Sequence, residues 1–423
     1  MEQVQARAPI CLTYCSLPYR GRGWPQTCAS ILAEFDNEGL APIFVLPRLR
    51  RRLPASITAP CGLKYPLNKM PWRWVSKLAA ARTSARFREL LDRADPATTI
   101  AYLWPGVPKD LVEHARRLGI ITVREMINTY QGTAKRILDQ AYERAGVVPA
   151  HGISARDVSQ EAEELWLYDY IFAPAPGVEV SLAEAGIPRE RVLAGSYGWT
   201  PERFGPTTPI RSPDPIGVRL LFVGIVGVRK GIPELLEAWR RSRVKGKLVL
   251  VGEIEPGLER DVLAAVEAGG VQHIPFTTQL AAYYGSSDVF VFPTHEEGCP
   301  QVVMEAAGCG LPVITTPMGA GRLVEHGVNG LWVSSGSVAE LAAAIRKLAH
   351  DPRLRHNLAF RMHSDAQAFT YQRIGQDRAR IFKKLLALRH RKAPNLNEPF
   401  SQPLAVPERR AGRPDGYGLP ELL

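Results

Sequence analysis

Short apolar runs alternate with stretches of helical periodicity along most of the chain, and this alternation occurs twice. Apolar, β-branched runs predict strands of a buried parallel sheet, and the stretches between them predict helices. In the first half the expected strands are residues 10–17, 41–47, 98–104, 120–126, 168–174 and 191–195, and the expected helices are 25–39, 107–119, 131–144 and a stretch before Gly186. In the second half the expected strands are residues 218–224, 247–252, 271–276, 289–293 and 311–316. Two such series predict two doubly wound α/β domains in tandem.

A loop rich in Gly and Pro, residues 195–217, separates the two series and is typical of an interdomain linker. The C-terminal residues are rich in Pro and Arg without periodicity, a composition that favours disorder. The expected divisions are an N-terminal acceptor domain at residues 1–198, a linker at 199–216, a C-terminal donor-binding domain at 217–370, a closing helix at 371–391 and a disordered tail at 392–423.

Composition narrows the class of protein. The chain has 423 residues, of which 45% are hydrophobic and 22% charged, so fibrous and wholly disordered classes are excluded. The six cysteines show neither C-x-x-C nor zinc-ligand spacing, which favours reduced thiols over a disulfide framework. The N-terminal residues do not have the pattern of a signal peptide, and no apolar run is long enough to span a bilayer. We therefore expect a soluble, cytoplasmic protein of two domains.

The net charge of +11 is concentrated in one segment: residues Arg48–Ala94 hold twelve Lys and Arg against Glu89 and Asp92. Residues 72–93 of this segment predict a helix with a narrow apolar stripe bordered by basic residues. The stripe consists of Trp74, Leu78, Ala81 and Ala85, and its borders are Arg73, Lys77, Arg88, Arg82, Arg86 and Arg93. This pattern is typical of a helix on an anionic membrane surface, and packing of the stripe on the domain core is the alternative. Nucleic-acid binding is disfavoured, because no recognition motif accompanies the basic residues.

The most informative stretch runs from the strand expected at Val289–Phe292 through a loop into a helix that opens at Pro300. Ligands of open α/β sheets bind where the carboxyl end of a strand meets the N-terminus of the next helix. Free backbone N–H groups near Gly298, Cys299 and Gln301 are expected to face an anion, and the helix dipole favours phosphate there. Gly298 is expected to let the ligand approach the backbone closely.

Two carboxylates accompany this anion site: Glu297 in the loop and Glu305 on the following helix. Carboxylates beside a phosphate suit sugar hydroxyls rather than the phosphate itself. We therefore expect Glu305 to accept from a ribose and Glu297 from a hexose. The alternative is a pair of ordinary glutamates near a helix start, where negative charge is favourable in any case.

With seven residues between them, Glu297 and Glu305 in EEGCPQVVMEAAGCGLPVITT resemble the E-x7-E signature of family 4 glycosyltransferases, also called group 1. The resemblance implies the GT-B fold: two facing Rossmann-like domains, with a nucleotide-sugar donor in the C-terminal one and retention of anomeric configuration. It implies that Glu297 contacts the donor sugar and Glu305 the ribose. The residues implied to donate backbone hydrogen bonds to the sugar and diphosphate are Gly298, Cys299, Pro300 and Gln301.

A second element of the donor site follows the strand expected at residues 218–224. A turn there places Arg229 and Lys230 just before a helix, where cations can neutralise a departing diphosphate, as metal-free sugar transfer requires. The resemblance assigns Lys230 to the K-G lysine of the family, but the arginine that relatives carry after the glycine of the strand is Ile225 here. Arg229 is the expected substitute, and a solvated charge is the alternative for each cation.

Two weaker signals belong to the same site. Phe276, in the loop at residues 274–277, is expected to stack on the nucleotide base, with core packing as the alternative. The turn after the first strand contains Gly21, Arg22 and Gly23 and resembles the glycine-rich loop that approaches the diphosphate from the N-terminal domain.

The N-terminal side of the expected site departs from the family. Many relatives carry a histidine at the end of a mid-domain strand, but residues 121–136 contain none, and His151 lies downstream. Glu125 or Asn128 is the expected contact to the acceptor or reacting sugar, and a structural role is the alternative for both. No Asp-x-Asp occurs, so we expect metal-free chemistry with no metal ligands and no cofactor besides the nucleotide-sugar co-substrate.

These signals predict a retaining, metal-independent glycosyltransferase that moves a hexose from a nucleotide-diphosphate sugar to a hydroxyl of a saccharide or lipid-linked glycan, as in cell-envelope or exopolysaccharide synthesis. Two rivals are a nucleotide-sugar epimerase on the same fold and a non-catalytic nucleotide-sugar-binding partner subunit. The expected location is the cytoplasm, with peripheral binding to the inner face of the cytoplasmic membrane through residues 48–94 and without a nucleic-acid partner.

Overall fold

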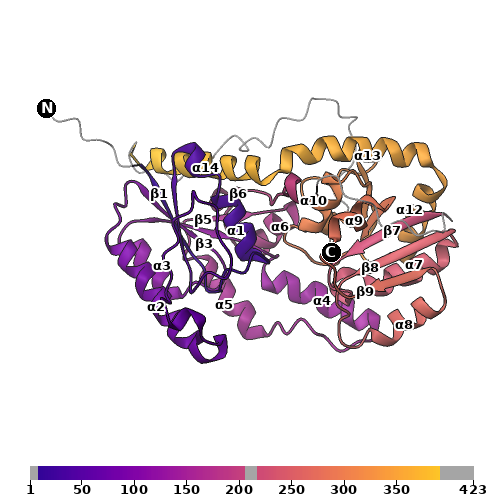
Figure 1. The fold of residues 1–423 in the computed structure, drawn as a ribbon, viewed down its shortest axis with the longest axis horizontal. Helices are drawn as coiled ribbons and strands as arrows, with labels where there is room; N and C mark the ends of the chain where they lie inside the picture. The colour runs from indigo at the N-terminus through magenta and orange to yellow at the C-terminus, as the bar shows by residue number, and fades with distance from the viewer. Residues whose placement is uncertain (1–7, 205–216, 391–423) are drawn as a thin grey trace.

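Each half of the chain folds around a six-stranded parallel sheet in a computed structural model that describes residues 8–204 and 217–390 (Figure 1). The two sheets lie side by side along the long axis of the molecule, with helices on their faces. This arrangement confirms the prediction of two doubly wound α/β domains. The predicted linker falls mostly on residues 205–216 and the predicted tail on residues 392–423, both outside the described residues.

The N-terminal sheet has the strand order β2-β1-β3-β4-β5-β6. Its strands are β1 (Ile10–Tyr14), β2 (Ala41–Val45), β3 (Thr99–Leu103), β4 (Ile121–Glu125), β5 (Tyr170–Ala173) and β6 (Val192–Ala194). Its helices are α1 (Trp24–Leu32), α2 (Trp72–Asp92), α3 (Lys109–Arg117), α4 (Gln131–Ala145), α5 (Ala155–Leu165) and α6 (Pro176–Glu184). All five residues of β3 are buried, as expected for a central strand covered on both faces.

The C-terminal sheet has the order β12-β11-β10-β7-β8-β9. Its strands are β7 (Val218–Val223), β8 (Gly246–Val251), β9 (Val271–Ile274), β10 (Val289–Phe292), β11 (Val313–Thr315) and β12 (Gly330–Trp332). The helices are α7 (Ile232–Ser242), α8 (Glu259–Glu267), α9 (Leu280–Gly285), α10 (Gln301–Gly308), α11 (Pro317–Ala320), α12 (Val338–His350), α13 (Pro352–Ala366) and α14 (Tyr371–His390). The loops after β7, β8 and β10 meet the N-terminal domain at the carboxyl edge of this sheet.

The sequence did not predict α5 or β12, and it predicted α1 too long. Helix α1 ends at Leu32, and the 3-10 turn Asp36–Glu38 follows, closed by Gly39 in the left-handed conformation. Helix α5 begins with a capping box in which Ser154 and Asp157 each bind the backbone N–H of the other.

Helix α2 packs through a different face from the predicted stripe. Its buried residues are Val75, Ala79, Thr83, Phe87 and Leu91. The stripe residues Trp74, Leu78, Ala81 and Ala85 are all exposed, so the alternative in which the stripe packs on the domain core is wrong. No helix in the described part of the chain is long and apolar enough to cross a membrane.

The last helix, α14, returns from the C-terminal domain to cover the N-terminal sheet (Figure 1). The ring of Phe382 lies 5.7 Å from that of Phe35, 5.1 Å from Tyr102 and 5.8 Å from Phe172. Through α14 the C-terminal part of the chain therefore contributes to the hydrophobic core of the N-terminal domain.

Candidate active site

The loop from β10 to α10 lies at the centre of the domain interface, and every residue from Pro293 to Pro300 is buried. Backbone and side chains hold it from several directions. The hydroxyl of Thr316 donates to the carbonyl of Thr294 at 2.7 Å, and the His295 N–H donates to the carbonyl of Arg229 at 2.9 Å. These contacts fix the two carboxylates that follow, Glu296 and Glu297.

Glu297 and Lys230 form an ion pair within the C-terminal domain. Lys230 ends a 3-10 turn after β7, and its ammonium lies 5.5 Å from the centre of the Phe292 ring. Burial lowers the pKa of the Lys230 ammonium, and the carboxylate of Glu297 opposes this fall. The Thr294 hydroxyl lies 3.4 Å from the same Glu297 carboxylate. Lys230 and Glu297, predicted from separate motifs, therefore meet in one place.

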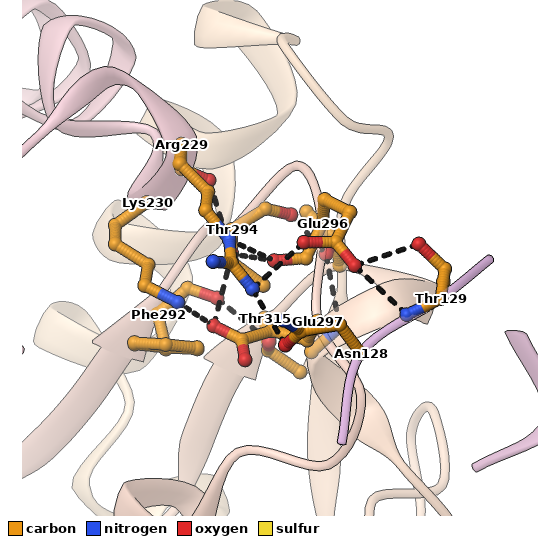
Figure 2. A network of polar contacts seen from close by, with 11 residues as sticks. Asn128, Thr129, Arg229, Lys230, Phe292, Thr294, Glu296, Glu297 and Thr315 are labelled. Atoms are coloured by element: carbon orange, nitrogen blue, oxygen red, sulfur yellow. Dashed lines mark hydrogen bonds and ion pairs between the residues drawn. The ribbon is translucent and has the colours of Figure 1, made fainter. Parts of the chain in front are cut away.

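Arg229 faces the N-terminal domain instead. Its Nη2 donates to Oδ1 of Asn128 at 3.0 Å and lies 2.7 Å from Oε2 of Glu296. Oε1 of Glu296 in turn accepts from the backbone N–H and hydroxyl of Thr129 at 3.1 and 2.7 Å. Figure 2 shows Arg229 and Lys230 on one side of the loop and Asn128 and Thr129 of the N-terminal domain on the other. This network joins the two domains beside Glu297.

The N-terminal domain lies directly against Gly298, so the absence of a side chain at this position serves the domain contact as well as a ligand. A Cβ atom at this position would lie 2.0 Å from the carbonyl oxygen of Ile127 in the N-terminal domain. The next contact across the interface is Gln301, whose amide donates to the Thr27 hydroxyl at 2.6 Å and accepts from the Tyr371 hydroxyl at 3.0 Å. The side chain of Gln301 is therefore committed to the interface, and only its backbone remains for the predicted anion contact.

A pocket of about 360 Å³ opens at this point between the domains. It brings together predicted residues from three separate motifs, namely Gly23, Lys230, Glu297, Cys299, Pro300 and Gln301. Gly23 has a φ of 66° at the start of α1, a conformation that favours glycine. Arg229 and Asn128 line a second, larger cavity instead, which shares Lys230 with the first.

Glu305 lies on α10, is 8% exposed and lines neither of the two pockets. Burial raises the pKa of its carboxyl to about 7, although Arg203 at 3.7 Å and a 3.1 Å hydrogen bond from Tyr284 act in the opposite direction. Phe276 follows β9 and is 75% exposed, so core packing is excluded for this ring. It lines neither of the two pockets.

The predicted contact of Glu125 with the acceptor or reacting sugar is corrected by its surroundings. Its side chain is fully buried, it forms an ion pair with Arg378 of α14, and it accepts a 2.5 Å hydrogen bond from Tyr102. This carboxylate is occupied by protein partners, although Glu125 is among the residues that line the larger cavity. Glu125 therefore has the structural role that was the alternative, and Asn128 is the remaining candidate.

Two residues of the site were missed. The sequence contained a weak indication for Glu296, because it is a second carboxylate beside Glu297. It contained no indication that Thr129 belongs to the site. No group of three or more His, Cys, Asp or Glu in residues 8–204 and 217–390 is arranged to hold a metal ion. The expectation of metal-free chemistry stays a prediction.

The range that contains Lys230, Glu297 and Glu305 also matches a known family. Residues 217–351 match the family model described as "Glycosyl transferases group 1". These residues, which make up less than half of the chain, are similar to group 1 glycosyltransferases. The predicted resemblance is thereby confirmed for this part of the chain.

Parts of this chain are also similar to glycosyltransferases from several bacteria. The capsular polysaccharide biosynthesis glycosyltransferase CapM of Staphylococcus aureus is 35% identical over 144 residues, which is 32% of this chain and 38% of CapM. The N,N'-diacetylbacillosaminyl-diphospho-undecaprenol alpha-1,3-N-acetylgalactosaminyltransferase of Campylobacter jejuni is 26% identical over 158 residues, 37% of this chain and 42% of the relative. The chain thus spans about two fifths of the length of these curated relatives.

A solved structure, HepE of Anabaena in complex with UDP and glucose, matches the whole architecture of both domains with a TM-score of 0.63. The match covers 89% of this chain and 100% of HepE at 16% identity, so it concerns the fold alone. Together with the family match of residues 217–351, it confirms the predicted GT-B fold.

Proposed function

We propose that this protein is a retaining, metal-independent hexosyltransferase that uses a nucleotide-diphosphate sugar. The observation that carries the proposal is the convergence of Lys230 and Glu297 with the N-terminus of α10 in one interdomain pocket. A cation and free backbone N–H groups suit a diphosphate, and a neighbouring carboxylate suits the hydroxyls of a hexose. The domain match and the names of the relatives support this class of reaction.

In this proposal the donor separates the Lys230–Glu297 pair. The diphosphate takes the ammonium of Lys230, and a hexose hydroxyl donates to the carboxylate of Glu297. The bond between the anomeric carbon and the diphosphate oxygen breaks, and its electrons stay with the diphosphate. The oxygen of the acceptor hydroxyl bonds to the anomeric carbon on the same face, and the proton of that hydroxyl passes to the departing diphosphate oxygen. Lys230 and the α10 backbone lower the barrier by stabilising the charge that develops on the leaving diphosphate. Glu305, with its buried carboxyl, binds the ribose, and Phe276 stacks on the base.

The acceptor proposed is a saccharide or lipid-linked glycan of cell-envelope or exopolysaccharide type. The relatives named for capsular polysaccharide and for a diphospho-undecaprenol substrate support this class. The N-terminal domain also exposes large apolar side chains among its basic residues, which suits peripheral binding to the anionic inner face of the cytoplasmic membrane. These side chains are Leu17, Leu49, Tyr65, Met70, Trp74 and Leu78.

A second candidate function is a nucleotide-sugar-binding subunit without catalytic activity. It is favoured by two departures from the family: Ile225 stands where relatives carry an arginine, and residues 121–136 lack the histidine that many relatives carry at the end of a mid-domain strand. Ile225 is 59% exposed at the mouth of the larger cavity and brings no charge to it.

Titration with UDP- and GDP-sugars, followed by a turnover assay, separates these functions. A transferase is stabilised against heat by one donor and transfers its hexose to a saccharide in a panel of acceptors. Tight donor binding without transfer or hydrolysis would instead identify the binding subunit. Conversion of the donor to an isomer would identify an epimerase.

The membrane part of the proposal has its own test. Vesicles with anionic lipids should bind the wild-type chain more strongly than a variant in which Arg50, Arg51, Arg52, Arg73 and Lys77 are changed to Gln. A matched control changes five exposed cations of the C-terminal domain: Arg243, Lys245, Arg260, Arg353 and Arg361. Equal binding of the wild type and the first variant would refute membrane association through this segment.

A further inference from the structure

The larger interdomain cavity, of about 990 Å³, lies across Lys230 from the donor pocket. Its N-terminal wall comes from the ends of β3 and β4 and from α4 and α5. Its C-terminal wall comes from Ile225, Arg229 and residues 253–256, and Asn128 and Glu296 lie between the two walls. If the proposed function holds, a molecule in this cavity sits next to the transferred sugar, where the acceptor belongs.

The cations of this cavity are already paired with carboxylates. Arg124 binds Glu161 at 3.2 Å, Arg229 binds Glu296 at 2.7 Å, and Lys230 pairs with Glu297. The only histidine in its described lining, His151, lies 3.0 Å from Asp139. These pairs leave no unpaired cation among the described residues of the wall, so an anionic group of an acceptor would have to displace a carboxylate.

Three further carboxylates of the wall form no ion pair with any described residue. Glu255 is 9% exposed and accepts only a 2.5 Å hydrogen bond from Tyr142. Glu164, on α5, accepts from Gln160 at 2.8 Å, and Glu253 is exposed at the end of β8 on the opposite wall. The walls also contain a buried donor, Nε of Arg124, that no described residue binds. The cavity therefore has a surplus of negative charge together with an unused N–H group.

We infer that this cavity selects its acceptor by charge and takes an amine-bearing sugar ring in preference to an anionic one. An ammonium group is attracted by Glu164, Glu253 and Glu255, and a phosphate or carboxylate is repelled by them. Ring hydroxyls can both donate to these carboxylates and accept from an N–H group. The inference rests on the proposed function, because it assigns the cavity to the acceptor. It is compatible with a lipid-linked acceptor whose phosphate stays outside, at the basic face of the N-terminal domain.

The test compares glucosamine with glucose 6-phosphate, two rings of similar size and opposite charge, by saturation-transfer NMR on the full chain. We expect glucosamine to bind about tenfold more tightly, and the ratio to shrink as salt is added. In the double variant Glu164→Gln, Glu253→Gln the ratio should fall toward one. Glu163→Gln is the matched control, because Glu163 is an exposed neighbour on α5 that does not line the cavity, and it should keep the wild-type ratio.

Tighter or equal binding of glucose 6-phosphate, an unchanged ratio in the double variant, or no binding of either sugar would overturn the inference. Titration with UDP on the same samples keeps the two proposals apart. Absence of nucleotide binding by the wild type would count against the proposed function. The ratio of the affinities for glucosamine and glucose 6-phosphate reports only on the cavity.

Discussion

Two carboxylate–cation pairs, one in the N-terminal core and one at the donor pocket, differ in what surrounds them. Glu125 and Arg378 have side-chain exposures of 0% and 2%, whereas Glu297 and Lys230 have exposures of 10% and 15%. The first pair is completed by Tyr102 and by the carbonyl of Ser196, which accepts from Arg378 at 3.2 Å. The second pair opens onto the donor pocket.

This difference separates a structural charge from one that can act on a ligand. When all hydrogen bonds of a buried ion pair are made by the protein, removal of either partner lowers the free energy of unfolding. Such a pair has no group left to bind a ligand. A pair at a pocket wall can exchange one partner for a substrate group. Access to the pocket, rather than the ion pair itself, is therefore our reason for proposing Glu297 as the functional carboxylate.

Substitution of the accessible carboxylate should give the largest effect. Glu297→Ala is expected to lower kcat by roughly a thousandfold, because the hexose loses its carboxylate contact in the transition state. Affinity for UDP or GDP should stay close to the wild type, since the nucleotide is held elsewhere. Steady-state kinetics and calorimetry measure the two quantities, and unchanged turnover would show that Glu297 is not part of the catalytic site.

Substitution of the enclosed cation should affect stability instead. Arg378→Met leaves Glu125 buried without a partner and is expected to lower the free energy of unfolding by about 3 kcal/mol or more. The double variant Glu125→Gln, Arg378→Met should recover part of this loss in a urea titration. A single variant as stable as the wild type would mean that the pair contributes nothing.

The close approach at Gly298 gives an intermediate effect. A methyl group there meets the Ile127 carbonyl, so Gly298→Ala should hold the domains apart and lower kcat by about tenfold or more through misplacement of the reacting groups. Small-angle scattering should show a larger radius of gyration. Wild-type values in both measurements would contradict this role of the glycine.

The smallest effect concerns pH. The pKa of Glu305 is raised to about 7 by burial, so its carboxyl becomes protonated as the pH falls below that value and accepts fewer hydrogen bonds. If the ribose needs the ionised form, affinity for UDP should weaken by about fivefold over roughly one pH unit below the pKa. Glu305→Gln is the control and should give a flat profile. A flat wild-type profile would argue against ribose binding by Glu305.

The sequence was most informative where a function depends on neighbours in the chain. Glu297, Glu305 and the glycine between them lie within one strand–loop–helix unit, so their spacing alone placed them at the edge of the sheet. The partner of Glu125 could not be found in this way, because Arg378 lies 253 residues further along the chain. Only the path of α14 reveals that this carboxylate is enclosed.

The amphipathic pattern of α2 did not reveal which face of this helix packs on the domain. Its buried positions include Thr83 and Ala79, whereas Trp74 and Leu78 are exposed. The exposed stripe rules out the alternative in which it packs on the core, and the face that does pack contains small or polar side chains such as Ala79 and Thr83, which hydrophobicity alone does not single out. The capping box at Ser154 and Asp157, in contrast, was a local signal for α5 that the sequence did contain.

The course of α14 has a consequence for protein engineering. By sequence this helix belongs to the C-terminal half, but by packing it belongs to the N-terminal core through Phe382 and Arg378. A chimaera that combines the donor domain of this chain with the acceptor domain of a relative would bring a helix fitted to the wrong core. Exchangeable modules should therefore be cut between α13 and α14, so that residues 371–390 travel with the N-terminal domain.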